Sequence, residues 1–97
     1  MKLKYSYICV LFVPLESEFS HYICVHVPDL GCATYGFSRS HTIEMAKEVI
    51  RLRLMDFVDD NLPFPKARTV QQLKRAKTEY LEYIVDNEYT EYVVVSE

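Results

Sequence analysis

Apolar and polar residues are arranged in a way that predicts three strands in the first third of the chain. Residues 5–13 are rich in β-branched and aromatic side chains, which is typical of a strand covered on both faces. Residues 21–27 alternate, with apolar side chains at odd positions from 23 onward, so we expect a hairpin with the first strand. Proline and glycine within 28–31 predict a turn, and a short third strand is expected over 32–37.

A long amphipathic helix is predicted next. Ser38 or Ser40 can cap its first turn. Apolar residues then recur at i+3 and i+4 spacing and form a stripe of roughly 80°, which we expect to face the sheet. This stripe consists of Ile43, Ala46, Ile50, Leu54 and Phe57. The helix is predicted to end near residues 59–61, where Pro63 and Pro65 begin a fixed linker.

Two interpretations fit the last third of the chain. A second helix over about 69–85 is favoured because several apolar residues share one helical face. These are Val70, Leu73, Tyr80, Leu81 and Ile84. The alternative is a hairpin, with alternation over 80–85 and a turn at 86–87. Either way, residues 89–95 predict a final strand.

The expected fold class is therefore α+β, with the order β-β-β-α-(α)-β in one domain spanning residues 1–97. We expect a mixed sheet in which three antiparallel strands are joined by a C-terminal strand lying parallel after the helical crossover. The principal helix should pack on one face of this sheet.

The net charge of the chain indicates which class of partner it is suited to bind. The 97 residues carry a formal net charge of −3, which favours a basic protein partner over nucleic acid, because nucleic-acid affinity depends on clustered Lys and Arg. A chain this small has a small core, so oligomerisation would stabilise it, and we expect a homo-oligomer. No run approaches a membrane span and no leader is visible. Three cysteines without a CxxC motif indicate a cytoplasmic protein with reduced thiols.

The outer side of the principal helix is the first candidate interface. Met45, Val49 and Leu52 fall within roughly 60° of one another, nearly opposite the core stripe. The second helix could pack there, or the patch could bind another copy or a partner. Tyr89 and Tyr92 are further candidates, since tyrosine is common at interfaces, although strands also favour aromatic residues.

Residues 27–36 resemble the signature of the HicB-type antitoxins, in which a strand ends in PDLPGC and resumes with a small residue or Thr and Gly. The matching turn motif is Pro28, Asp29, Leu30, Gly31 and Cys32. The Ala-Lys-Glu element at 46–48, the proline-bearing linker at 62–65 and the valine-rich segment at 92–95 also resemble the family. The chain has one proline fewer in the motif, so we expect a turn that is tighter or differently shaped.

The resemblance implies an antitoxin that blocks HicA, a small basic RNA-cleaving toxin, and a fold like a truncated ribonuclease H. Acidic residues near the C-terminus would complement such a basic toxin. They are Glu79, Glu82, Asp86, Glu88 and Glu91. Many HicB proteins add a C-terminal DNA-binding segment, whereas this chain ends at Glu97 after its last predicted strand, so we do not expect DNA binding.

Catalysis and cofactor binding are not expected. A two-metal nuclease needs converging carboxylates, yet residues 5–13 contain neither Asp nor Glu, which leaves Glu44 and Glu91 without a partner on the first strand. Cys24, His26 and Cys32 lack paired zinc-ligand spacing and a fourth ligand. We therefore expect a binding protein without metal or cofactor: a HicB-like antitoxin, or alternatively an orphan oligomeric module with no toxin.

Overall fold

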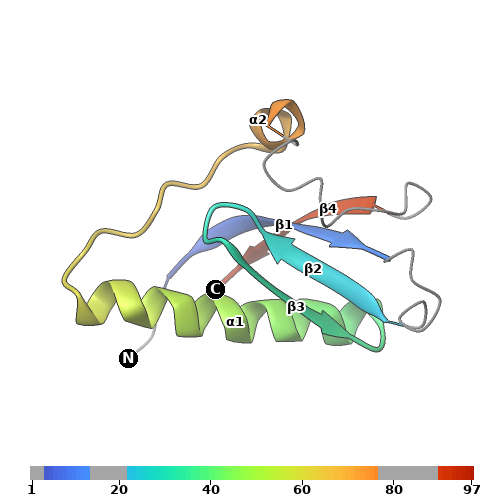
Figure 1. Ribbon diagram of the computed structural model, residues 1–97, viewed down its shortest axis with the longest axis horizontal. Helices are drawn as coiled ribbons and strands as arrows, with labels where there is room; N and C mark the ends of the chain where they lie inside the picture. The colour runs from blue at the N-terminus through green and yellow to red at the C-terminus, as the bar shows by residue number, and fades with distance from the viewer. Residues whose placement is uncertain (1–3, 14–21, 77–89) are drawn as a thin grey trace.

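The computed structural model describes residues 4–13, 22–76 and 90–97 (Figure 1). Its elements are β1 (Ser6–Phe12), β2 (Ile23–Val27), β3 (Cys32–Gly36), α1 (Arg39–Asp59), α2 (Val70–Arg75) and β4 (Thr90–Ser96). The three early strands and the long helix lie where the sequence pattern predicts them.

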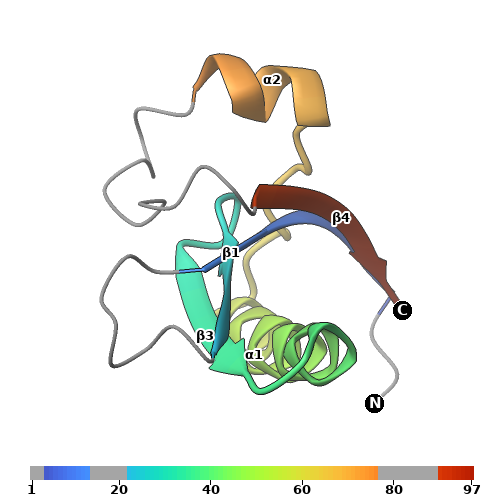
Figure 2. The same ribbon diagram turned by 90° about the vertical axis from the view of Figure 1, so that its right-hand side faces the viewer.

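The four strands form one sheet in the order β3-β2-β1-β4. β1 pairs with β2 and β2 pairs with β3, both antiparallel, which confirms the predicted meander. β1 lies inside the sheet, and six of its seven residues are buried. The expectation of a strand covered on both faces is therefore confirmed for β1. The sheet curves over α1 (Figure 2).

The direction of the last strand differs from the prediction. β4 runs antiparallel to β1, with Ser6 opposite Ser96 and Phe12 opposite Thr90, so the described sheet is antiparallel throughout and not mixed. The physical reason is the path of the chain. The linker after α1 passes the start of β1, where Tyr7 contacts Pro65. From there a strand would run parallel to β1. However, β4 begins at Thr90, beside Phe12 at the opposite end of β1, and runs back toward Ser6.

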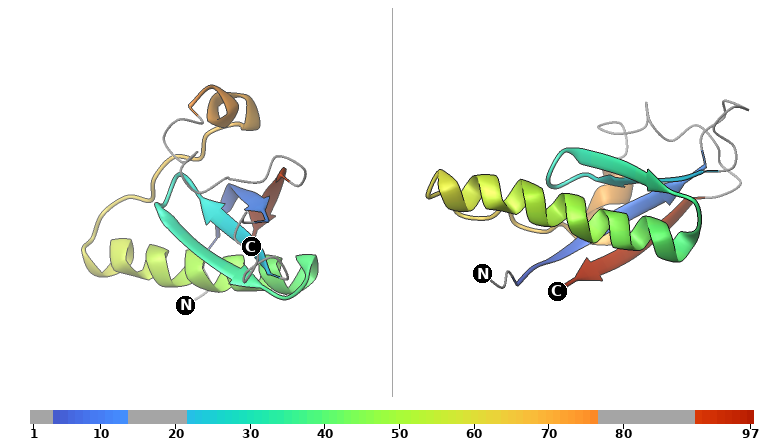
Figure 3. Two further views of the ribbon diagram at one scale, coloured as in Figure 1. Left: turned by 45° about the vertical axis from the view of Figure 1, so that its right-hand side comes forward. Right: turned by 90° about the horizontal axis from the view of Figure 1, so that it is seen from below.

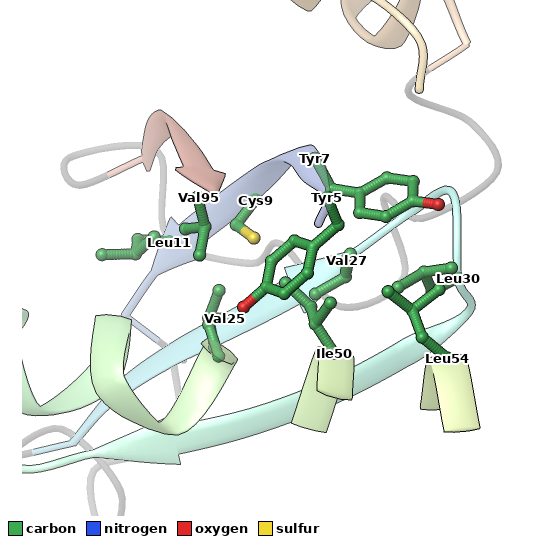
Figure 4. Close-up of a cluster of buried hydrophobic side chains, with 11 residues drawn as sticks. Tyr5, Tyr7, Cys9, Leu11, Val25, Val27, Leu30, Ile50, Leu54 and Val95 are labelled. Carbon is green, nitrogen blue, oxygen red and sulfur yellow. The ribbon is translucent and has the colours of Figure 1, made fainter. Parts of the chain in front are cut away.

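The main core lies between α1 and the sheet (Figure 4). Ile50 and Leu54 of α1 are fully buried, and Ile43 and Phe57 pack at the margins of the same cluster, as the apolar stripe predicts. β1, β2 and β4 contribute Tyr7, Cys9, Leu11, Val25, Val27 and Val95, and Tyr5 joins them from just before β1. Burial of these side chains removes the largest apolar area in the described part of the chain from water.

The start of α1 is fixed by two hydroxyl groups. Ser38 is the N-cap, and its Oγ accepts a hydrogen bond from the backbone N–H of His41, so Ser38 and not Ser40 caps the helix. Thr42 is buried on the core side of the helix, and its hydroxyl group shares its one hydrogen between the Ser38 carbonyl oxygen at 2.7 Å and the Ile23 carbonyl oxygen at 3.0 Å. Thr42 therefore ties α1 to the end of the β2–β3 hairpin.

The opposite face of the sheet carries α2 (Figures 1 and 2). Thr69 caps α2 in a capping box, because its side chain accepts from the Gln72 N–H while the Gln72 side chain accepts from the Thr69 N–H. α2 ends at Arg75, which is shorter than the predicted helix over 69–85. The remainder of that prediction, and the alternative hairpin at 80–87, lie outside the described residues.

Candidate protein-binding surfaces

The PDLGC motif forms the turn between β2 and β3. The N–H groups of Leu30 and Gly31 both donate to the Val27 carbonyl oxygen, at 3.1 and 2.9 Å. Gly31 has φ of +64°, a left-handed conformation that glycine adopts without steric cost. Leu30 is buried in the main core. The turn is therefore tight, and its conformation places one apolar side chain inward and Asp29 beside the linker.

Asp29 holds the linker that follows α1. Its carboxylate accepts from the backbone N–H of Arg68 at 2.9 Å and from Nε of the same residue at 2.6 Å. Only 4% of the Asp29 side chain is exposed. Nearby, the Tyr7 hydroxyl donates to the Pro65 carbonyl oxygen at 2.7 Å, and burial, followed by the Asp29 charge, raises the pKa of Tyr7. The motif thus has a clear structural role in this chain.

The candidate patch on α1 is accessible to solvent. Leu52 is 63% exposed, and Met45 and Val49 are half-buried. The described second helix, α2, lies across the sheet from α1 and does not cover these residues (Figure 1). The interpretation in which the second helix packs on Met45, Val49 and Leu52 is therefore wrong for α2.

One flank of α1 faces β4. Arg51 makes an ion pair with Glu97 at 2.9 Å, and Arg39 makes a two-pronged contact with Glu91 whose shortest distance is 2.6 Å. The Tyr5 hydroxyl donates to Glu97 at 3.2 Å, and burial, followed by the Glu97 charge, raises the pKa of Tyr5 to about 12. Because the core stripe separates the two flanks of the helix, Met45 and Val49 lie on the flank away from β4.

The exposed carboxylates of α1 lie between these two flanks. On a helical wheel, Glu44, Glu48 and Asp59 project outward with Leu52 beside them. Glu44 contacts Lys47 at 3.4 Å. Within the described residues, Glu48 and Asp59 take part in no ion pair. We call Glu44, Glu48, Leu52 and Asp59 the outer strip of α1. It carries three exposed carboxylates and an exposed leucine, and Lys47 and Arg51 adjoin it on the flank that faces β4.

An aromatic cluster covers part of the sheet face opposite α1, and the sequence analysis did not identify it. Tyr22 lies 5.1 Å from Tyr35 and 5.2 Å from Phe37, measured between ring centroids. Tyr35 is 53% and Phe37 64% exposed. Strand alternation puts Tyr35 on the face opposite the core, so the pattern itself contained the signal. Exposed aromatic residues in contact with one another favour an interface.

The C-terminal candidates are only partly described. Tyr92 packs against Val10 and Phe12 on the face opposite α1, and the Lys74 ammonium group lies 5.3 Å from its ring centroid. Tyr92 is therefore half-buried beneath α2. Tyr89 lies outside the described residues, as do four of the C-terminal acidic residues: Glu79, Glu82, Asp86 and Glu88. The fifth, Glu91, contacts Arg39.

The structure separates the residues considered for metal binding. Val27 is paired with Cys32, so Cys32 shares the core face, whereas Cys24 and His26 project from the other face of the sheet. Burial lowers the pKa of His26 and raises the pKa of the Cys24 thiol. In the part of the chain that is described, no group of three His, Cys, Asp or Glu side chains is arranged to hold a metal ion.

The two carboxylates considered for a nuclease site have different surroundings. Glu44 projects into solvent from the outer strip of α1, and Glu91 contacts Arg39 at the edge of the sheet. Burial raises the pKa of the Cys9 thiol in the main core to about 12, so this cysteine is protonated at neutral pH. The described geometry thus offers exposed apolar and acidic surfaces as its clearest features.

No protein-family model, no curated protein and no solved structure matches the chain. Neither of the described helices has the combination of length and apolar character that crossing a bilayer requires.

Proposed function

We propose that the chain is a HicB-type antitoxin that acts in the cytoplasm, binding and occluding a small, basic, RNA-cleaving toxin. Inhibition of this kind needs a surface that complements the toxin in shape and charge, and it needs no catalytic group of its own. The resemblance at residues 27–36 supports the proposal, because the motif stands at the β2–β3 turn of a β-β-β-α arrangement.

The observation that carries the proposal is the outer strip of α1. It presents Glu48 one turn before Leu52, which is 63% exposed, with Glu44 and Asp59 about two turns away on the same side of the helix. An exposed apolar side chain with carboxylates on the same side of the helix is suited to a partner that offers an apolar pocket with basic groups near it, since the anchor supplies affinity and the charges supply orientation and association rate. The neighbouring cations Arg51 and Arg53 are each paired with an acidic residue, Glu97 and Asp56. A basic toxin fits this surface better than an acidic protein or a nucleic acid.

Co-expression with a basic protein encoded beside this chain tests the proposal. We expect the two proteins to co-purify, and we expect this chain to suppress the RNA cleavage and growth arrest that the basic protein causes alone. The E48K/L52K variant should lose both effects, because it replaces the anchor and reverses one charge of the outer strip.

Val94→Lys is the matched control. Val94 is a similarly exposed apolar residue on β4, away from the outer strip, at 59% exposure. V94K should therefore still bind and neutralise the toxin. A basic neighbour that neither co-purifies nor cleaves RNA would contradict the proposal, and a stable oligomer without such a partner would identify an orphan interaction module.

A further inference from the structure

Within the described part of the chain, β3 is an edge strand that lacks two of the residue types that normally protect one. It ends the described sheet at the side opposite β4, and its five residues, Cys32–Gly36, include no charged residue and no proline. Natural edge strands are usually blocked by Lys, Pro, a bulge or a covering segment, because their unpaired N–H and C=O groups can bind another strand. An uncharged edge can pair with an identical copy without repulsion between like charges.

The sequence of β3 is complementary to itself in one register. In an antiparallel pair centred on Thr34, Ala33 of each copy lies opposite Tyr35 of the other, and Thr34 lies opposite Thr34. Ala33 and Tyr35 are both exposed on the face opposite α1. Each tyrosine ring can therefore cover a small residue of the other copy, while the two threonines form a favourable cross-strand pair on the core face.

The same register brings the two α1 helices together. α1 runs antiparallel to β3, because Gly36 lies against Thr42 and the Arg53 guanidinium donates to the Leu30 carbonyl oxygen at 3.2 Å. Thr34 is two strand residues from Gly36, which is about 6.6 Å, or roughly four helical residues. The two-fold axis that would relate the two copies lies at Thr34, and it therefore passes α1 at the level of residues 46–47.

Met45 and Val49 lie on either side of that level, on the flank of α1 that faces away from β4. β3 and α1 lie side by side when the molecule is seen from below (Figure 3). A two-fold axis at residue 47 puts Met45 of one copy opposite Val49 of the other, and the reverse. The half-buried apolar flank of α1 and the edge of β3 thus form one continuous surface.

We propose that this surface binds a second copy of the chain, with β3 paired to β3 in the register centred on Thr34 and with Met45 packed against Val49 across the helices. The dimer continues the sheet from four strands to eight and removes both uncharged edges from solvent. Its surface adjoins the outer strip of α1 at Leu52 but uses none of the four residues of that strip, and it specifies the oligomer that the proposed function leaves open.

Sedimentation equilibrium of the purified chain, without any toxin, tests the dimer. We expect a mass of twice the 11.4 kDa chain in the micromolar range. The A33K/Y35K variant should dissociate, because the register places an introduced lysine opposite another introduced lysine twice, which weakens the dimer roughly tenfold or more. The A33K/Y35E variant should dimerise again, because each introduced lysine then lies opposite an introduced glutamate of the other copy.

The charge-swapped variant also shows that residues 33 and 35 tolerate charge in the folded chain. Val94→Lys, on the other sheet edge, should leave the dimer intact. A monomeric wild-type chain, dissociation by V94K, or A33K/Y35E remaining as monomeric as A33K/Y35K would each overturn the assignment. Toxin binding is measured separately by co-purification, so failure of the dimer and failure of the proposed function are distinguishable.

Discussion

Replacing Gly36 with alanine tests the closest approach between the sheet and α1. A methyl group at residue 36 would lie 2.6 Å from both the backbone nitrogen and Oγ1 of Thr42, and 2.8 Å from its Cα. Non-bonded atoms pack at about 3.5–4.0 Å, so the start of α1 must move by roughly 1 Å. Rotation of the Thr42 side chain cannot relieve the contact, because two of the three atoms belong to the backbone.

The cost follows from what that movement breaks. Overpacking of this kind costs about 1–3 kcal/mol. A shift of Thr42 also disrupts the hydrogen bond from its hydroxyl to the Ile23 carbonyl oxygen, worth about 1 kcal/mol. We therefore expect Gly36→Ala to lower the free energy of unfolding by about 2–4 kcal/mol. The unfolding midpoint should fall by roughly 10–25 °C, since about 1 kcal/mol shifts a domain of this size by about 4–8 °C.

Thermal and urea unfolding followed by circular dichroism measure this loss. Gly31→Ala is the matched control, because Gly31 has a positive φ of +64° but nothing within 4 Å of the added methyl group. It should cost only the backbone strain, about 1–2 kcal/mol. In the G36A/T42A double variant the loss should persist, because the clash with the backbone remains. A G36A loss that is no larger than the G31A loss and lies below about 2 kcal/mol, or recovery in the double variant, would refute the reasoning.

Two further predictions concern buried charge and protonation. Asp29→Asn should lower the free energy of unfolding, measured in urea, by about 1–3 kcal/mol, because it weakens the two contacts with Arg68. The control, Asp56→Asn, removes one partner of an exposed pair with Arg53 at 3.7 Å and should cost no more than about 0.5 kcal/mol. Similar losses for both variants would show that the Asp29 contact does not anchor the linker. His26 has a pKa lowered by burial, so the folded state binds fewer protons than the unfolded state, and stability should fall as the pH drops below 6.5. His26→Gln should flatten that decline when unfolding is measured from pH 7 downward, and an unchanged slope would assign the protonation to another group.

The elements that the sequence predicts are those whose apolar pattern is strong and local. The α1 stripe repeats at helical spacing over four turns, and the structure buries Ala46, Ile50 and Leu54 as expected. The same pattern overlooks Thr42, which is equally buried, because a count of apolar residues ignores a hydroxyl that finds two carbonyl acceptors. A polar residue on the core side of a helix needs a partner that only the tertiary structure supplies.

Contacts between distant segments account for what the sequence pattern did not reveal. Asp29 and Arg68 are separated by 39 positions, and neither belongs to a periodic pattern that links them. The sequence could have predicted that Cys24 and His26 lie on one face of the sheet and Cys32 on the other. Four residues lie between the paired positions Val27 and Cys32, so the parity of the inward-facing residues changes across the turn. A hairpin register would have been enough to place the three side chains on different faces.

The direction of β4 is set by the end of the sheet at which the last strand begins, and no local sequence pattern encodes that end. The antiparallel pairing with β1 places β4 beside β1 alone within the described sheet. It also makes β4 the second sheet edge, held to α1 through Arg39 and Arg51. The edge of β3 and the adjoining flank of α1 remain for a second copy, while the outer strip of α1 projects away from both sheet edges. Because the two proposed surfaces share no residue, a substitution at Glu48 is expected to act on toxin binding and a substitution at Ala33 on the dimer.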